Sequence, residues 1–190
     1  MAGCKLTRSL DSKRCEYSIT GARAVYLANF YGPVEGDAAV ADAIAYKFDK
    51  DGYIEKISLP EGEKFYKIAG EKNTVSFTDA LLVGGNNGKY RQHTVNAVVN
   101  QLDVDVLKEG DALSLGQFIA VIVDNAGRVV VLGRKSGLSA PAGGFDYQSG
   151  AAETDATGWT MVLQGLSTEI ARLVKSAAVI TPIHQEVVVP

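Results

Sequence analysis

A chain of 190 residues with 46% hydrophobic and 22% charged residues can bury a core as a single domain, so global disorder is excluded. The formal net charge is −3 and no basic stripe stands out, which argues against nucleic-acid binding through neutralised phosphates. The longest apolar runs, such as FIAVIV at 118–123, are too short to cross a bilayer, and the first residues lack the apolar segment of a secretory signal.

The composition favours a mainly β fold. There are 20 glycines and 5 prolines, and Val, Ile, Thr and Tyr are frequent. Glycine suits tight turns, and β-branched and aromatic residues favour strands. Cys4 and Cys15 do not make a disulfide scaffold; they can form one bridge across a loop or remain free thiols.

The first expected strand is ARAVYLANFYG at 22–32. Its expected core residues are Val25, Leu27 and Phe30. The next segment, 33–46, is expected to be a surface insertion. Its alanine content predicts a short helix over DAAVADAIA, with Asp37 as the N-cap.

A hairpin is predicted at 46–59, because DKDG is a strong turn signal between two β-rich runs, and a further strand at 63–70. The DKDG segment also partly resembles a calcium loop. With Gly52 at the required glycine, however, Lys47 and Ser58 occupy the positions of two of the strongest acidic ligands. No calcium site is therefore expected.

Residues 76–99 predict a long two-stranded ribbon with a turn at 84–90. Along its second arm, side chains alternate between a mostly apolar face and a mostly polar face. The first face holds His93, Val95, Ala97 and Val99, and the second holds Thr94, Asn96, Val98 and Asn100. The turn GGNNGKY is not a phosphate loop, because Gly85 and Gly88 are too close and Tyr90 follows the lysine.

Residues 103–117 change to helical spacing and predict one short helix, capped by Asp103 or Asp105 and ending near Gly116. The clearest hairpin follows at 118–134, where two β-branched strands meet at Asp-Asn-Ala-Gly.

The segment 135–158 is rich in Gly, Ala and Ser and is expected to be a long loop or contact arm that proteases cut readily in the free subunit. A strand at 159–167 follows, and 168–177 reads as a strand or a short helix. Residues 1–177 are thus expected to form one β domain. The apolar segment 178–190 is expected to be an extended arm, which either pairs with a neighbouring subunit's sheet or forms a terminal strand of its own.

No catalytic or metal-binding motif is found. The two histidines, His93 and His184, and the two cysteines have no paired spacing typical of zinc sites. The chain also lacks a Gly-x-Ser-x-Gly elbow and a Gly-rich cofactor fingerprint, although scattered Ser, His and Asp residues can still come together in a fold. We expect no enzyme activity, no cofactor and no metal.

The order of the expected strands, ribbon and helix along the chain resembles that of a known family. CKLTRSLDSKRCEYSITGARAVYLANFYG leads to the ribbon NTVSFTDALLVGGNNGKYRQHTVNAVV, and the helix VDVLKEGDALSLGQ runs into FIAVIVDNAGRVVVLGRKSGL and GWTMVLQGL. This order resembles the tail-tube-like structural proteins of tailed bacteriophages of gut bacteria, including crAss-like phages, over residues 1–174. The resemblance implies a β-sandwich or small β-barrel with one flanking helix and a long protruding hairpin.

The resemblance also implies a role. Such subunits assemble into a ring, sixfold in most tubes and twelvefold in the alternative, around a channel through which DNA passes during ejection. Their partners are copies of themselves and adjacent tail or neck proteins, and DNA passes without sequence-specific binding. The expected location is the virion tail, after assembly in the bacterial cytoplasm, with no membrane anchor. The length of 33–46 and 178–190 favours a specialised ring over a plain stacked tube.

The ribbon is then expected to contact neighbouring copies around the lumen, and its wall should be neutral to acidic because DNA must slide past it. The candidate residues for assembly and for the lumen are Asp79, Asn86, Asn87, Lys89, Arg91, Asn96 and Asn100, with Glu71 as a further acid. Lys89 and Arg91 are expected to pair with acids of the next subunit.

Two other classes remain open at this stage. The chain can be a tube subunit of a contractile injection or secretion system, which shares the architecture. It can also be a β-barrel binding module, or a hydrolase with scattered catalytic residues. Rings or tubes in electron micrographs separate the assembling classes from the last one.

Overall fold

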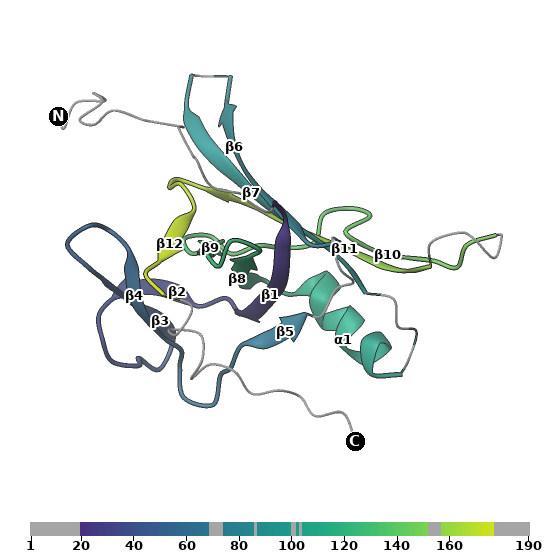
Figure 1. Cartoon of the computed structure of the whole chain (residues 1–190), viewed down its shortest axis with the longest axis horizontal. Coiled ribbons are helices and arrows are strands. Elements are labelled where there is room, and N and C mark those ends of the chain that lie inside the picture. Colours follow the sequence, from purple (N-terminus) through teal and green to yellow (C-terminus); the bar gives the residue numbers. More distant parts are fainter. Residues whose placement is uncertain are drawn as a thin grey trace.

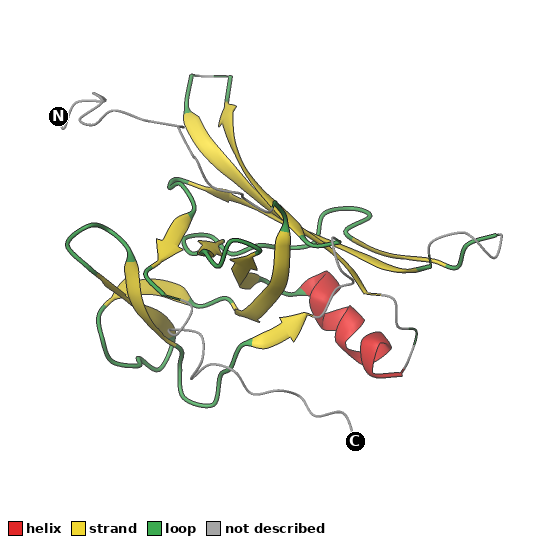
Figure 2. Cartoon of the chain, viewed as in Figure 1, coloured by secondary structure: helices red, strands yellow, loops and turns green. Residues whose placement is uncertain are grey.

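The computed structural model describes residues 20–68, 74–85, 87–99, 102, 104–151 and 157–176. This part of the chain forms two β-sheets and one helix, α1 (Val104–Leu115) (Figures 1 and 2). The predicted mainly β class is therefore confirmed.

The larger sheet has eight strands. Their order is β2 (Gly32–Glu35), β3 (Ala43–Phe48), β4 (Ile54–Ser58), β12 (Arg172–Val174), β9 (Val129–Leu132), β8 (Phe118–Asp124), β1 (Ala22–Asn29) and β5 (Tyr66–Ile68). The smaller sheet has four strands, in the order β10 (Phe145–Gln148), β11 (Gly158–Ser167), β7 (Lys89–Val99) and β6 (Ser76–Val83).

Strands β8 and β9 are buried along their whole length, because apolar side chains cover both faces of the large sheet there. One core cluster joins residues of β1, β8 and β9 to residues of β3 and β4. The other cluster lies between these central strands and the small sheet, and includes Val25, Ile122, Val95 and Leu163. This double cover explains why 118–134 reads as two continuous apolar runs.

Several predicted elements are confirmed. The hairpin at 46–59 is the antiparallel pair β3–β4, and 118–134 is the pair β8–β9. The ribbon is the antiparallel pair β6–β7, and the expected helix is α1. The undecided segment 168–177 contains the strand β12, while 178–190 lies outside the described residues.

The short helix expected within 33–46 is wrong, whereas the expected surface position holds for residues 34–42, which are exposed. The segment forms β2 and most of β3, which pair in parallel, and Ile44 and Tyr46 are core residues. Asp37 caps no helix; its carboxylate lies 3.3 Å from Lys47 Nζ and 3.1 Å from Lys56 Nζ. Burial of the apolar side chains of β3 in the core shared with β1, β8 and β9 overrides the weak helix preference of the alanines.

The long arm expected at 135–158 is in part a component of the body. Leu138 is fully buried, and β10 adds a strand to β11. Backbone bonds join Ser139 to Gln164 in both directions at 2.8 Å. The glycines here allow close backbone contact, because a Cβ on Gly165 would collide with the carbonyl oxygen of Gly137.

The substitution Gly165→Ala is therefore expected to lower the free energy of unfolding by about 1–3 kcal/mol, since the backbones of two paired segments must move apart. Gly36→Ala is the matched control, because a Cβ there meets no atom within 4 Å. Urea unfolding of both variants measures the difference. Equal midpoints would show that the close contact of Gly165 carries no constraint.

Candidate assembly surface

The small sheet has one buried and one open face along most of its length. Antiparallel pairing places Asn96 opposite Ser76 and Thr94 opposite Gln164, so even-numbered residues of all four strands share one face. The odd-numbered face packs on the large sheet through residues such as Val95 and Leu163. We call the even-numbered face the open face.

The open face carries almost no charge. Polar side chains bond across its strands, with Gln92 Nε2 3.1 Å from Gln164 Oε1 and Asn96 Nδ2 3.3 Å from Ser76 Oγ. Asp146 is its single carboxylate, and no lysine or arginine lies on it among the described residues. Its residues are Ser76, Thr78, Ala80, Leu82, Tyr90, Gln92, Thr94, Asn96, Val98, Asp146, Gln148, Thr160, Val162, Gln164 and Leu166.

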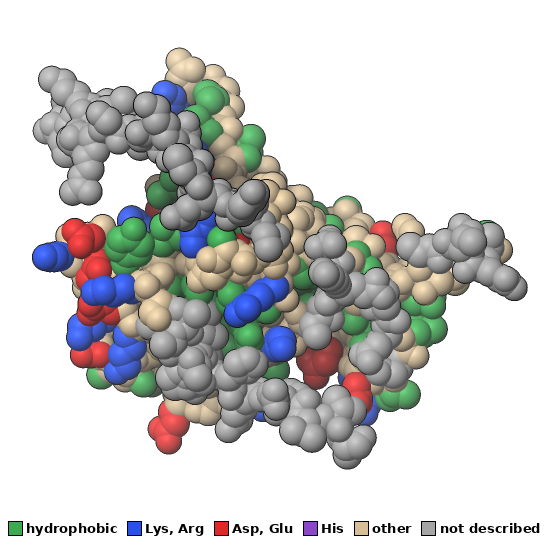
Figure 3. All heavy atoms as spheres, in the orientation of Figure 1, with side chains coloured by type: hydrophobic (Ala, Val, Ile, Leu, Met, Phe, Trp, Pro, Cys, Tyr) green, Lys and Arg blue, Asp and Glu red, His purple; other side chains and the backbone are tan. Residues whose placement is uncertain are grey.

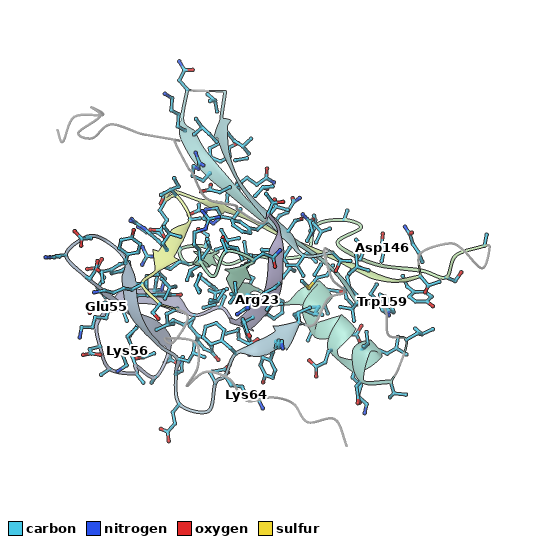
Figure 4. All side chains as sticks on the ribbon, viewed as in Figure 1. Arg23, Glu55, Lys56, Lys64, Asp146 and Trp159 are labelled. Carbon is cyan, nitrogen blue, oxygen red and sulfur yellow. The ribbon has the colours of Figure 1, made fainter. Side chains whose placement is uncertain are left out.

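Charged side chains gather elsewhere. Figure 3 shows lysines, arginines and acids crowded over the side that holds β3 and β4, whereas the ribbon is mostly tan and green. In Figure 4, Glu55 and Lys56 lie on that crowded side, and Asp146 and Trp159 lie on the arm formed by β10 and β11. The low charge is thus a property of the open face and not of the whole protein surface.

The base of the ribbon is fixed by a partly buried carboxylate. Arg91 Nε donates to Asp79 Oδ1 at 2.7 Å, and the Ala171 amide donates to Asp79 Oδ2 at 2.9 Å. Although burial opposes ionisation, these hydrogen bonds hold the pKa of Asp79 below its usual value. The expectation that Arg91 pairs with the next subunit is replaced by this pair within the chain.

A second ion pair, which is more deeply buried, lies close by. Arg134 Nε and Nη2 each donate to a different oxygen of Glu169 at 2.6 Å, and both side chains are 8% exposed. The Arg134 guanidinium also lies 5.3 Å from the ring centroids of Tyr46 and Phe48. Burial opposes ionisation of Glu169, but the Arg134 hydrogen bonds hold its pKa below the usual value. The pair ties the β11–β12 connection to the large sheet.

His93 connects the ribbon base to the backbone that follows β9. Its Nδ1 accepts a hydrogen bond from the Gly133 amide at 3.2 Å, and its Nε2 lies 3.5 Å from Asp79 Oδ1. The ring is 2% exposed. The ring is therefore held in the interior, with Nδ1 bonded to the backbone of Gly133. The ring is a structural part of the ribbon base.

The buried histidine predicts a loss of stability in mild acid. Burial lowers the pKa of His93, although the carboxylates of Asp79 and Glu169 favour its charged form. The unfolded chain then takes up a proton first, near pH 6.5, so the free energy of unfolding should fall as the pH drops from 7.5 to 5.5. Urea unfolding at both pH values measures this change.

The variant His93→Gln is the control, since glutamine offers an acceptor to the Gly133 amide but does not titrate. Its urea midpoint should change less between pH 7.5 and pH 5.5 than that of the wild-type protein. A wild-type midpoint that is the same at both values would contradict the assignment.

The other candidate residues divide by position. Asn96 lies on the open face, whereas Asp79 and Arg91 lie on the opposite face and pair with each other. Lys89 is exposed at the start of β7, next to the turn of the ribbon, and Asn87 occupies this turn with a φ of 57°. Asn86, Asn100 and Glu71 lie outside the described residues.

The described part of the chain holds no group of three His, Cys, Asp or Glu side chains able to bind a metal, and its single helix is not long and apolar enough to span a membrane. A cavity of about 320 Å³ lies beside the start of β1, and its charged residues Asp124 and Arg128 already pair at 2.6 Å.

Fold and surface thus define a mainly β protein with a low-charge sheet face and a ribbon that extends past the body (Figure 1). Comparisons with protein-family models, curated proteins and solved structures gave no match.

Proposed function

We propose that the protein is a structural subunit of a bacteriophage tail that assembles into a ring or tube around a channel for DNA. The open face of the small sheet would form the wall of this channel. The role is mechanical and needs no catalytic step. The subunit would act in the virion tail, beside adjacent tail or neck proteins.

The observation that carries the proposal is the charge of the open face. A ring repeats every wall residue once per subunit, and contacts between cations and phosphates add steeply to DNA affinity. A wall that passes DNA must therefore avoid unpaired lysine and arginine. The open face meets this requirement, with uncharged polar and apolar side chains and one acid, Asp146.

The edges of the small sheet support the same role. Strands β6 and β10 end its strand order, so each leaves one side unpaired within the described chain. Exposed edges invite pairing with another chain, and closure into a ring removes them. A sheet that continues from subunit to subunit would present the open face as one surface.

Electron microscopy of the purified full-length protein tests the proposal. We expect rings or stacked rings with a central channel, sixfold or twelvefold, at micromolar to millimolar protein concentration. Light scattering after size-exclusion chromatography gives the subunit number independently. Particles that remain monomeric over this range and in the presence of other tail proteins would contradict the proposed function.

A further inference from the structure

The helix α1 has two apolar sides, of which the body covers one. Val106, Gly110 and Leu113 lie on the inner side, and Gly110 is buried against Phe145 of β10. A Cβ on Gly110 would lie 2.8 Å from Phe145 Cε1, so the helix is in close contact with the small sheet. This contact fixes which side of α1 faces solvent.

The outer side carries an uncovered apolar stripe. Val104, Leu107 and Leu115 are between 51% and 87% exposed, and their helical spacing places them in one row with Asp111. Asp111 has no ion-pair partner among the described residues, whereas Lys108 lies 3.7 Å from Asp105. A row of large apolar residues on a solvent-facing helix side is typical of a binding surface.

The end of the ribbon carries a matching surface. Leu81 and Val83 are 55% and 57% exposed, and they lie on the face of β6 that packs against the body further down. Lys89 lies directly opposite Val83, on the same face. Lys89 has no ion-pair partner in the described chain, and the one acid on this face of β6, Asp79, lies four residues further along the strand and pairs with Arg91.

The two surfaces complement each other in both polarity and charge. The ribbon end offers two aliphatic side chains and one lysine, and the outer side of α1 offers three aliphatic side chains and Asp111. Lys108 lies in the same row of the helix, but its charge is paired with Asp105. Figure 1 shows the ribbon end pointing away from the body and α1 lying apart from it, so one chain does not cover its own stripe.

We propose that the ribbon end of one copy docks on the outer side of α1 of the next copy, with Lys89 paired to Asp111. Leu81 and Val83 would pack on Val104 and its two leucine neighbours. Such a contact joins two different surfaces of identical chains, and repetition with a fixed rotation closes a ring. The inference rests on the proposed self-assembly and names the surfaces that make it.

Charge reversal tests the docking. Lys89→Glu and Asp111→Lys should each raise the protein concentration needed for ring formation about tenfold or more, because each places like charges together. The double variant carrying both changes should return it towards the wild-type value. An equimolar mixture of the two single variants should also assemble, since each ribbon end then meets an opposite charge on the other chain.

The matched controls change equal charges elsewhere. Lys67→Glu lies on β5, and Glu109→Lys lies on α1 away from the stripe; both side chains are exposed. Urea midpoints equal to wild type establish that the variants fold, and light scattering against concentration gives the assembly threshold.

The outcomes separate the docking from the function. If the wild-type protein forms rings and the Lys89 and Asp111 variants do so at the same concentration as the controls, the docking is overturned and the proposed function stands. The pairing is also overturned if the single variants assemble poorly and neither the double variant nor the mixture restores ring formation. If the wild-type protein never assembles, both proposals fail.

Discussion

Replacing Glu169 with alanine is expected to lower the free energy of unfolding by about 3–5 kcal/mol. The substitution leaves the Arg134 guanidinium buried without its carboxylate partner, beneath the rings of Tyr46 and Phe48. An uncompensated buried charge is far more costly than the loss of one contact, because it cannot recover its hydration. Urea or thermal unfolding at pH 7.5 measures the change.

Two controls define the cause of this loss. The double variant Arg134→Met and Glu169→Leu removes both charges and should be markedly more stable than Glu169→Ala alone. Asp37→Ala, which breaks exposed pairs with Lys47 and Lys56, should cost less than about 1 kcal/mol. A Glu169→Ala variant no less stable than Asp37→Ala would show that the buried pair does not fix the β11–β12 connection.

Local patterns predict those elements whose partner is close in the sequence. The hairpins at 46–59 and 118–134 have turn residues between two β-rich runs, so a single short segment contains both strands and the turn that pairs them. The alternation of His93, Val95 and Ala97 correctly gives the buried face of β7. In each case a single periodicity determines the element.

Interactions between distant segments are not predictable in the same way. The segment 33–46 reads as helical by composition, yet becomes β2 and β3 because the core accepts Ile44 and Tyr46. Arg134 and Glu169 are 35 residues apart, and no local pattern indicates that they meet. The helix α1 is correctly predicted, but spacing alone does not tell that Leu107 faces solvent while Leu113 packs inward.

For the candidate surface, too, local patterns are predictable and contacts between distant segments are not. The polar alternation of β7 identifies Asn96 as outward-facing, because the period of two separates the faces directly. Asp79 was expected at the lumen, but it lies on the other face, where Arg91 and the Ala171 amide bind its carboxylate. The low charge of the whole open face appears only after the registers of four strands are known.

Lysines introduced on the open face are expected to turn the assembled protein into a DNA-binding one. Thr78 and Leu166 lie on this face and are exposed, so Thr78→Lys with Leu166→Lys should leave the fold intact. A sixfold ring would gain about twelve positive charges on its channel wall. If about six phosphates are neutralised, affinity for duplex DNA should fall by about 10³-fold or more between 50 and 200 mM salt.

Fluorescence anisotropy of a labelled duplex across this salt range measures the effect, with micrographs to verify that the rings persist. The matched control places two lysines at Ala38 and Ala39, which are exposed between β2 and β3 on the large sheet. Because these positions lie outside the proposed channel, the control should bind DNA more weakly than the open-face variant. Equal affinities would remove the open face from the channel wall, and strong salt-dependent binding by the wild-type ring would instead favour a DNA clamp.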